Sequence, residues 1–188
     1  MPRRTVELYA GEYYHLYNRG NNRERIFFER ENYLFFLRRL RKYLVPILDV
    51  VAYCLMPTHY HLLIMLKEAD LSHRMQLFSI SYTKAMNKRY DRVGSLFQGA
   101  FQAIHVDENE YLIHLSRYIH LNPVMAGLVE RAEDWEFSSY REYIGLRNGT
   151  LPKSEIVLSQ FPSSEAYREF VESYVPDKRE IIADLLFD

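Results

Sequence analysis

Two histidines separated by one residue are the first candidates for chemistry in this chain. His59 and His61 open an apolar run that is typical of a β-strand. Because side chains alternate between the two faces of a strand, both imidazoles would point the same way, about 7 Å apart along the backbone. Two parallel imidazoles supply half of a divalent-metal site. The pair alone is equally compatible with one histidine exposed at the strand end and the other packed in the core.

A later helix, predicted from Glu108 to about Asn122, carries a second group of polar side chains. At 100° per residue, Tyr118 and Asn122 fall within about 40° of each other, and His114 lies at the edge of the same stripe. Pro123 follows at once, which predicts that the helix ends at Asn122 and presents its amide there. Taken singly, Tyr118 could be a core aromatic side chain and Asn122 a helix C-cap.

The elements that would position these residues follow a β-α-β-β-α-β order with one further helix. Strands are expected at residues 13–17, 47–55, 59–67 and 100–106, and helices at 32–43, 71–90 and 108–122. This is the ferredoxin-like order, an antiparallel sheet with helices on one face. We therefore predict an α+β fold in which an added helix carries the catalytic side chains.

Length and composition describe an ordinary globular domain. The chain has 188 residues, 48% of them hydrophobic and 26% charged, which suits one domain with a buried core. Its one cysteine, Cys54, lies in an apolar run, so no disulfide framework is expected and a reducing cytoplasm fits. Neither a signal-peptide pattern nor a run of 18 apolar residues is present, and we expect an intracellular protein with no membrane partner.

Charge is distributed unevenly along the chain. Residues 1–100 carry 16 Lys and Arg against 9 Asp and Glu, whereas residues 101–188 carry 8 against 16. The basic half suits a polyanionic partner such as nucleic acid, although solvated helix faces would give the same count. The 16 Tyr and 11 Phe include rings beside basic residues, which suit stacking on unpaired bases.

The acidic end of the chain is predicted to be a helical extension. Residues 150–188 hold 8 Asp and Glu against 4 Lys and Arg, with Tyr167, Phe170 and Tyr174 at helical spacing. We expect this extension to pack on a main domain of residues 1–149. Self-association, or coverage of the basic surface until DNA displaces it, are the alternatives.

Several motifs together resemble a known family. They are, in chain order, Tyr14-His15, Arg19-Gly20-Asn21, Met56-Pro57-Thr58-His59-Tyr60-His61, Leu96-Phe97-Gln98, Tyr118-Ile119-His120-Leu121-Asn122-Pro123-Val124 with Ala126-Gly127-Leu128-Val129, and Trp135 with Ser138-Ser139-Tyr140. The combination resembles the HUH endonucleases of the single-tyrosine transposase type, and most nearly the REP-associated tyrosine transposases. The resemblance extends from about Tyr14 to Tyr140. One departure is Tyr60, because the middle position of the His-x-His motif is usually aliphatic or Met.

The resemblance implies a covalent mechanism on DNA. Tyr118 would attack a phosphodiester to give a 5′-phosphotyrosine and a free 3′-OH. His59, His61 and the amide oxygen of Asn122 would hold Mg²⁺ or Mn²⁺, a neutral ligand set that leaves the ion its full charge. His114 or water would take the phenolic proton. His15, on the strand expected beside the His-x-His strand, would orient a ligand or simply pack.

The implied substrate is single-stranded DNA next to a hairpin, because base pairs would keep the scissile phosphate out of reach. Arg19, Asn21 and Arg23, in the turn predicted after the first strand, are candidates for DNA contacts, as are Arg3 and Arg4 on an N-terminal arm. The protein would be a DNA-associated protein of the bacterial cytoplasm, acting in transposition or in processing of repeated palindromes. Monomer and homodimer both stay open.

Two other functions fit the same residues. A metal hydrolase would use His59 and His61 without a covalent intermediate, and Tyr118 would then be structural. A nucleic-acid-binding module would have no catalysis at all. Within the leading hypothesis, Tyr111 lies seven residues before Tyr118, so a two-tyrosine enzyme is a further alternative.

Overall fold

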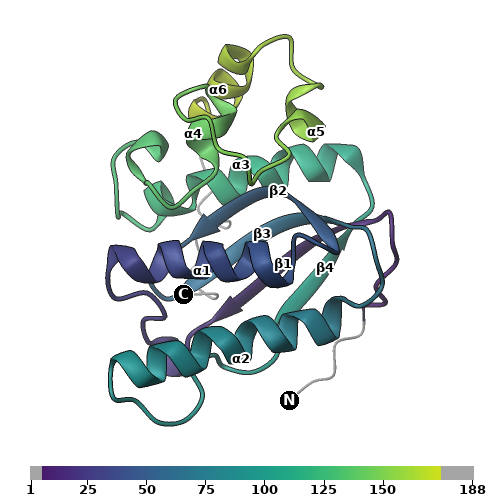
Figure 1. Cartoon of the computed structure of the whole chain (residues 1–188). Helices are drawn as coiled ribbons and strands as arrows, with labels where there is room; N and C mark the ends of the chain where they lie inside the picture. The colour runs from purple at the N-terminus through teal and green to yellow at the C-terminus, as the bar shows by residue number, and fades with distance from the viewer. Residues whose placement is uncertain (1–5, 175–188) are drawn as a thin grey trace.

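The computed structural model describes residues 6–174 and contains one four-stranded antiparallel sheet (Figure 1). The strands are β1 (Tyr13–Arg19), β2 (Leu48–Leu55), β3 (His59–Leu66) and β4 (Gln102–Val106). Their order across the sheet is β2-β3-β1-β4, so β1 lies between β3 and β4, and β2 and β4 are the edges. The predicted α+β class and the β-α-β-β-α-β order of elements are confirmed.

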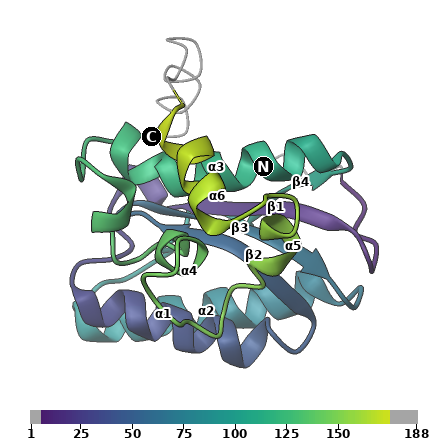
Figure 2. The ribbon, with the colours of Figure 1, turned by 90° about the horizontal axis from the view of Figure 1, so that it is seen from above.

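Three long helices cover the sheet on both of its faces. These are α1 (Arg30–Tyr43), α2 (Leu71–Arg89) and α3 (Asn109–Met125). Figure 2 shows α1 and α2 below the sheet and α3 above it. The two helices between the strands, α1 and α2, share one face as predicted, and the added helix α3 covers the other. Since nearly every residue of β2 and β3 is buried, each face of the sheet needs its own cover.

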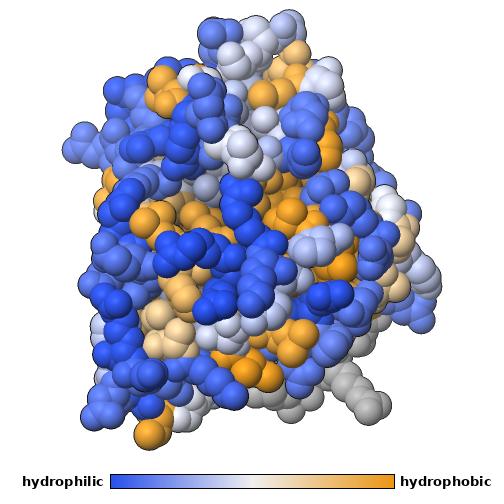
Figure 3. Space-filling view, in the orientation of Figure 1, coloured by the Kyte–Doolittle hydropathy of each residue, from blue (hydrophilic) through white to orange (hydrophobic). Residues whose placement is uncertain are grey.

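Side chains of α1 and α2 pack on one face and leave charged groups outside. Phe36 of α1 and Phe78 and Tyr82 of α2 are buried against the sheet, and the Tyr82 hydroxyl donates to the carbonyl of Ile26 at 2.7 Å. Figure 3 shows that this side of the molecule is largely hydrophilic, with apolar patches between the polar groups. Its exposed cations include Arg38, Arg41, Lys42, Lys84 and Lys88.

On the opposite face, α3 packs along the sheet with its proline inside the helix. The predicted end at Asn122 is wrong, because α3 continues to Met125. A proline removes one backbone donor, but the helix recovers at once: Ala126 N donates to Asn122 O at 2.9 Å and Leu128 N to Pro123 O at 2.9 Å. Asn122 is therefore a buried residue of the helix rather than its cap.

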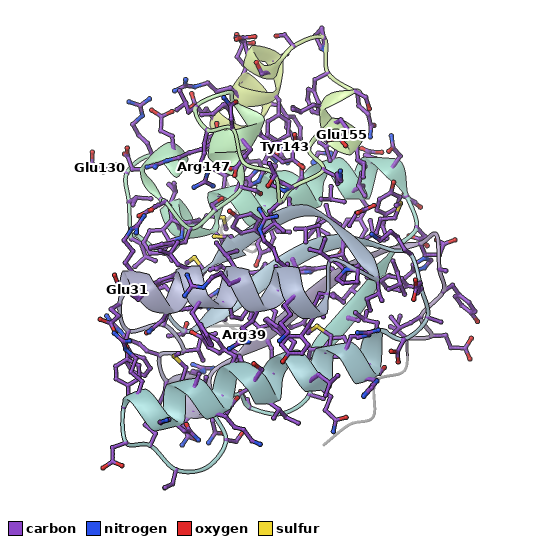
Figure 4. All side chains as sticks on the ribbon, viewed as in Figure 1. Glu31, Arg39, Glu130, Tyr143, Arg147 and Glu155 are labelled. Atoms are coloured by element: carbon purple, nitrogen blue, oxygen red, sulfur yellow. The ribbon has the colours of Figure 1, made fainter. Side chains whose placement is uncertain are left out.

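Short helices after α3 complete this second layer. They are η2 (Ala132–Asp134), α4 (Tyr140–Tyr143), α5 (Glu155–Leu158) and α6 (Ser164–Glu172). Tyr143 of α4 donates its hydroxyl to the carbonyl of Val51 in β2 at 2.9 Å, and Arg147 donates to the carbonyl of Glu136 at 2.7 Å (Figure 4). The first bond ties the segment to the edge strand β2, and the second joins two parts of the segment itself.

The described part of the acidic extension packs on this layer. Lys153 N donates to Val50 O at 2.7 Å, and Val157, Tyr167 and Val171 are fully buried in the core next to α3. The division into residues 1–149 and 150–188 stays a prediction. Among residues 6–174, no helix is long and apolar enough to cross a membrane.

Candidate metal and nucleophile site

The two histidines of the His-x-His motif lie side by side at the start of β3. Pairing of β1 with β3 places Arg19 opposite His59 and Tyr17 opposite His61. Both imidazoles are buried, and their ring centroids lie 5.0 Å apart with the planes nearly perpendicular. Tyr60, between them in the sequence, is buried on the other face of the sheet, among the core residues that pack against α1 and α2. Strand alternation thus orients the pair as the sequence predicted.

Each imidazole has a neighbour at its Nδ1 atom. The hydroxyl of Thr58 lies 2.9 Å from His59 Nδ1, and the Nε2 atom of His15 lies 2.9 Å from His61 Nδ1. The Nε2 atom of His61 is buried and has no hydrogen-bond partner among the described residues. A buried nitrogen without a partner is costly, so it indicates a site that a further atom completes.

Asn122 of α3 brings a third candidate ligand to the two histidines. Its Oδ1 atom lies 3.4 Å from His59 Nε2, and its side chain is buried. Within residues 6–174, no group of three or more His, Cys, Asp or Glu side chains could hold a metal ion. A cation here would therefore rely on two imidazoles and one amide oxygen, with water completing its shell. Two imidazoles and one amide oxygen tolerate Mn²⁺ or Mg²⁺, whereas Zn²⁺ more usually takes a third His, Cys or carboxylate ligand.

Burial keeps His15 and His61 neutral near pH 7. It lowers the pKa of His15 to about 4. For His61, burial lowers the pKa well below the usual value, and the neighbouring His59 and His15 lower it further. A neutral imidazole has a lone pair on one nitrogen and a hydrogen on the other, which is the form that binds metals.

Tyr118 of α3 lies over the same histidines. Its ring is 5.7 Å from the ring of His61 and 6.4 Å from that of His15, in both cases edge to face. The tyrosine is half-buried. Because Asn122 is one helical turn further along α3, the helix delivers a phenol and an amide to the same patch of the sheet. All of these residues belong to one chain.

A match to a protein-family model shows which family the chain belongs to. A model of the IS200-like transposases matches residues 9–122, which include both histidines, Tyr118 and Asn122. The chain belongs to the IS200-like transposase family.

Individual relatives share less than a third of their aligned residues with this chain. A Haemophilus influenzae protein named as a candidate REP-associated tyrosine transposase is 29% identical over an alignment of 103 positions, which covers 49% of this chain and 58% of that protein. The chain thus spans less than two thirds of that relative's length. A solved structure of a REP-associated tyrosine transposase bound to a REP hairpin has a TM-score of 0.63 at 18% identity. It covers 81% of this chain and 97% of the other, and it shows a shared fold.

A Deinococcus radiodurans transposase structure is more remote still. It is 18% identical, with a TM-score of 0.43 over 63% of this chain and 95% of the other. This similarity is too weak to support any argument about the IS200-like transposase described here.

His114, predicted to accept a proton, is exposed on α3. Its Nδ1 atom lies 2.8 Å from Arg117, its Nε2 atom lies 3.8 Å from Glu110, and its ring is 5.6 Å from that of Phe170 in α6. These contacts direct the imidazole toward the C-terminal helix. Its predicted role in proton transfer stays a prediction.

The predicted DNA-contacting residues lie at one end of the sheet. Arg19 is the last residue of β1 rather than part of a turn, and its Nε atom donates to the side chain of Gln98. Asn21 and Arg23 are exposed in a short 3₁₀ helix. Gly20 is required at the bend, because a Cβ there would lie 2.0 Å from the carbonyl oxygen of Glu24. Arg3 and Arg4 lie outside the described residues.

Two neighbours of the site escaped the reasoning from sequence. Tyr17 stacks on His61 with ring centroids 6.1 Å apart, and Thr58 approaches His59. The alternation of Tyr13, His15 and Tyr17 along β1 is a signal that would have placed Tyr17 on the face of the histidines.

Proposed function

We propose that this transposase nicks and rejoins single-stranded DNA beside a hairpin, with Tyr118 as the nucleophile. His59, His61 and Asn122 would hold a divalent cation, Mg²⁺ or Mn²⁺. One observation carries the proposal: the Tyr118 ring lies 5.7 Å from that of His61, whose buried Nε2 atom has no partner among the described residues. A nucleophile and a ligand that needs completion thus share one site in one chain.

The proposed step exchanges one phosphoester for another. The phenolic oxygen of Tyr118 forms a bond to phosphorus and loses its proton, while the bond from phosphorus to the 3′ oxygen breaks and that oxygen leaves as a 3′-OH. The 5′-phosphate stays on Tyr118. Attack by a 3′-OH reverses the step, so rejoining needs no ATP. A bound cation would neutralise charge on the phosphate oxygens.

Proton removal is the task left to the surroundings of Tyr118. A phenol with an ordinary pKa of about 10 is mostly protonated near neutral pH and is then a weak nucleophile. We assign the proton to water, because Tyr118 is half-buried rather than sealed from solvent. His114 is the second candidate, but its contacts with Arg117 and Phe170 hold it against α6.

The substrate class follows from family and surface chemistry. The distant solved relative is described as bound to a REP hairpin, and we extend that class of ligand to this chain. Asn21 and Arg23 offer an exposed amide and guanidinium at the end of β1, close to His59, where phosphate contacts would hold the strand. This role makes the protein DNA-associated, whether it acts as a monomer or as a homodimer.

The test uses a hairpin-flanked single-stranded oligonucleotide labelled at its 3′ end, on the fragment that keeps the 5′-phosphate. The oligonucleotide is incubated with Mn²⁺ and resolved on a denaturing gel. We expect a covalent adduct with the native protein. Tyr118→Phe should abolish the adduct and slow cleavage at least about a thousandfold, as removal of a nucleophile does in other enzymes. Tyr111→Phe, two turns earlier on the same helix, is the matched control and should retain the adduct.

Each alternative has its own outcome. Cleavage that persists without an adduct in Tyr118→Phe would favour a metal hydrolase. Binding without cleavage by the native protein would favour a nucleic-acid-binding module. Loss of the adduct in Tyr111→Phe as well would favour two tyrosines. Cleavage that resists a chelator would exclude the metal ion from the mechanism.

A further inference from the structure

His15 of β1 is stacked on His61 of β3 inside the molecule. Their ring centroids are 5.1 Å apart with an interplanar angle of 25°, and His15 Nε2 lies 2.9 Å from His61 Nδ1. His15 is 6% exposed and His61 is 3% exposed. The contact is therefore a direct hydrogen bond between two buried imidazoles.

Counting hydrogens leaves two possible arrangements for this pair. One hydrogen lies between the two nitrogens, because both rings are neutral. If His61 Nδ1 carries it, His61 Nε2 keeps a lone pair and can bind a cation. If His15 Nε2 carries it, the hydrogen of His61 must sit on Nε2, where it is buried without an acceptor among the described residues. The second arrangement wastes a buried donor and blocks the site.

We propose that His15 is a positioning residue for His61. It accepts a hydrogen bond from His61 Nδ1 and so fixes both the tautomer and the ring plane that leave His61 Nε2 bare for a cation. The inference rests on the proposed function, since it concerns the metal site of that reaction. It goes beyond the ligand set by naming the residue that prepares one ligand before any cation arrives.

The place of His15 in the sheet explains how it reaches His61. The hydroxyl of Thr58, next to His59 in the chain, approaches the Nδ1 atom of that histidine. His61 has its partner on a different strand, where the β1–β3 register sets His15 opposite Leu63, two residues beyond His61. At 6% exposure, the position is closed to the water that would replace a lost partner at the surface.

Two substitutions separate hydrogen bonding from packing. His15→Gln keeps an oxygen that can accept from His61 Nδ1, whereas His15→Phe keeps a flat ring and removes the acceptor. His105→Phe is the matched control, because His105 lies on β4 at the surface and pairs with Glu12. Thermal melts establish that each full-length variant is folded.

The first measurement needs no metal. Nitrogen-15 spectra of the imidazoles in the metal-free protein should show His61 protonated at Nδ1 in the native chain and in His15→Gln, but not in His15→Phe. The second is calorimetric titration with MnCl₂ in the absence of DNA. We expect His15→Phe to weaken Mn²⁺ binding about 10–100-fold, while His15→Gln and His105→Phe stay within a few-fold of the native protein.

Three results would overturn the inference. They are a native His61 protonated at Nε2, Mn²⁺ affinity unchanged in folded His15→Phe, and equal losses in His15→Gln and His15→Phe, which would mean that shape alone matters. If the native protein bound no Mn²⁺, the metal part of the proposed function would fail instead. The tautomer spectra would still decide the role of His15.

Discussion

Two buried histidines on opposite sides of α3 differ in one respect. His61 of β3 and His120 of α3 are both almost fully buried, and burial lowers the pKa of each, that of His120 to about 3. The Nδ1 atom of His120 lies 2.8 Å from the Tyr167 hydroxyl, and its Nε2 atom lies 2.8 Å from Ser139 Oγ. Among the described residues, His61 has a hydrogen-bond partner only at Nδ1. A histidine whose two ring nitrogens both make hydrogen bonds stabilises the fold, whereas one with a ring nitrogen that lacks a hydrogen bond can bind a metal ion there.

The paired histidine fixes the helix that carries the reactive groups. Tyr167 also contacts Ser116 Oγ at 3.0 Å, and Ser139 Oγ accepts from the backbone N–H of Tyr53 at 2.9 Å. The network therefore connects α3 with α6, with the start of α4 and with β2. His120 lies between Tyr118 and Asn122 in the sequence, so the same turn of helix is anchored on one side and directs its phenol and amide toward the histidines on the other.

The same substitution at both histidines should give opposite results, with the larger effect at His61. His61→Leu removes a ligand and should reduce both Mn²⁺ affinity and DNA cleavage by more than the about 100-fold expected for an outer partner. Its free energy of unfolding should change by no more than about 1–2 kcal/mol, because the lost bond to His15 is offset by removal of an unpaired nitrogen. Calorimetry with MnCl₂ and urea unfolding measure the two quantities. A large loss of stability with normal Mn²⁺ binding would reverse our comparison.

At His120 the same substitution should reduce the stability of the fold rather than metal binding. His120→Leu removes two buried hydrogen bonds and should lower the free energy of unfolding by about 2–3 kcal/mol. Metal affinity at low temperature, where the variant is folded, should stay within about tenfold of the native value. Urea unfolding monitored by circular dichroism provides the first number and MnCl₂ titration the second. Tyr167→Phe, which removes one partner of His120, should show a smaller loss of the same kind. If Tyr167→Phe were as stable as the native protein, the network would not be what anchors α3.

Sequence periodicity predicted which side chains share the site, but not which side chains contact them in the folded chain. Strand alternation placed His59 and His61 on one face, and helical spacing placed Tyr118 beside Asn122, because both are local properties of the backbone. The contact between His15 and His61 depends on the register of two strands 46 residues apart, which no local pattern encodes.

Other errors have the same origin. The predicted end at Asn122 followed a local rule, that a proline disfavours helical geometry in the residue before it. Packing of α3 on the sheet nevertheless carries the helix to Met125. His120 stood in a motif of the family, but its network with Tyr167 joins segments that meet only in the folded chain.

A second unpaired polar atom tests whether such atoms always signal function. The hydroxyl of Tyr60 is buried without a partner among the described residues, and it lies on the sheet face away from Tyr118. The oxygen lies in an apolar core, where the described residues offer no set of side chains that could hold a metal ion. No bound ion therefore offsets the free-energy cost of burying this hydroxyl without a partner. Tyr60→Phe should therefore leave Mn²⁺ affinity unchanged and raise the free energy of unfolding by up to about 1 kcal/mol, since it removes only the unsatisfied oxygen. Urea unfolding detects this gain. If the variant were less stable by 1 kcal/mol or more, the hydroxyl would have a partner, such as a buried water, and an unpaired atom would lose its value as a sign of a binding site.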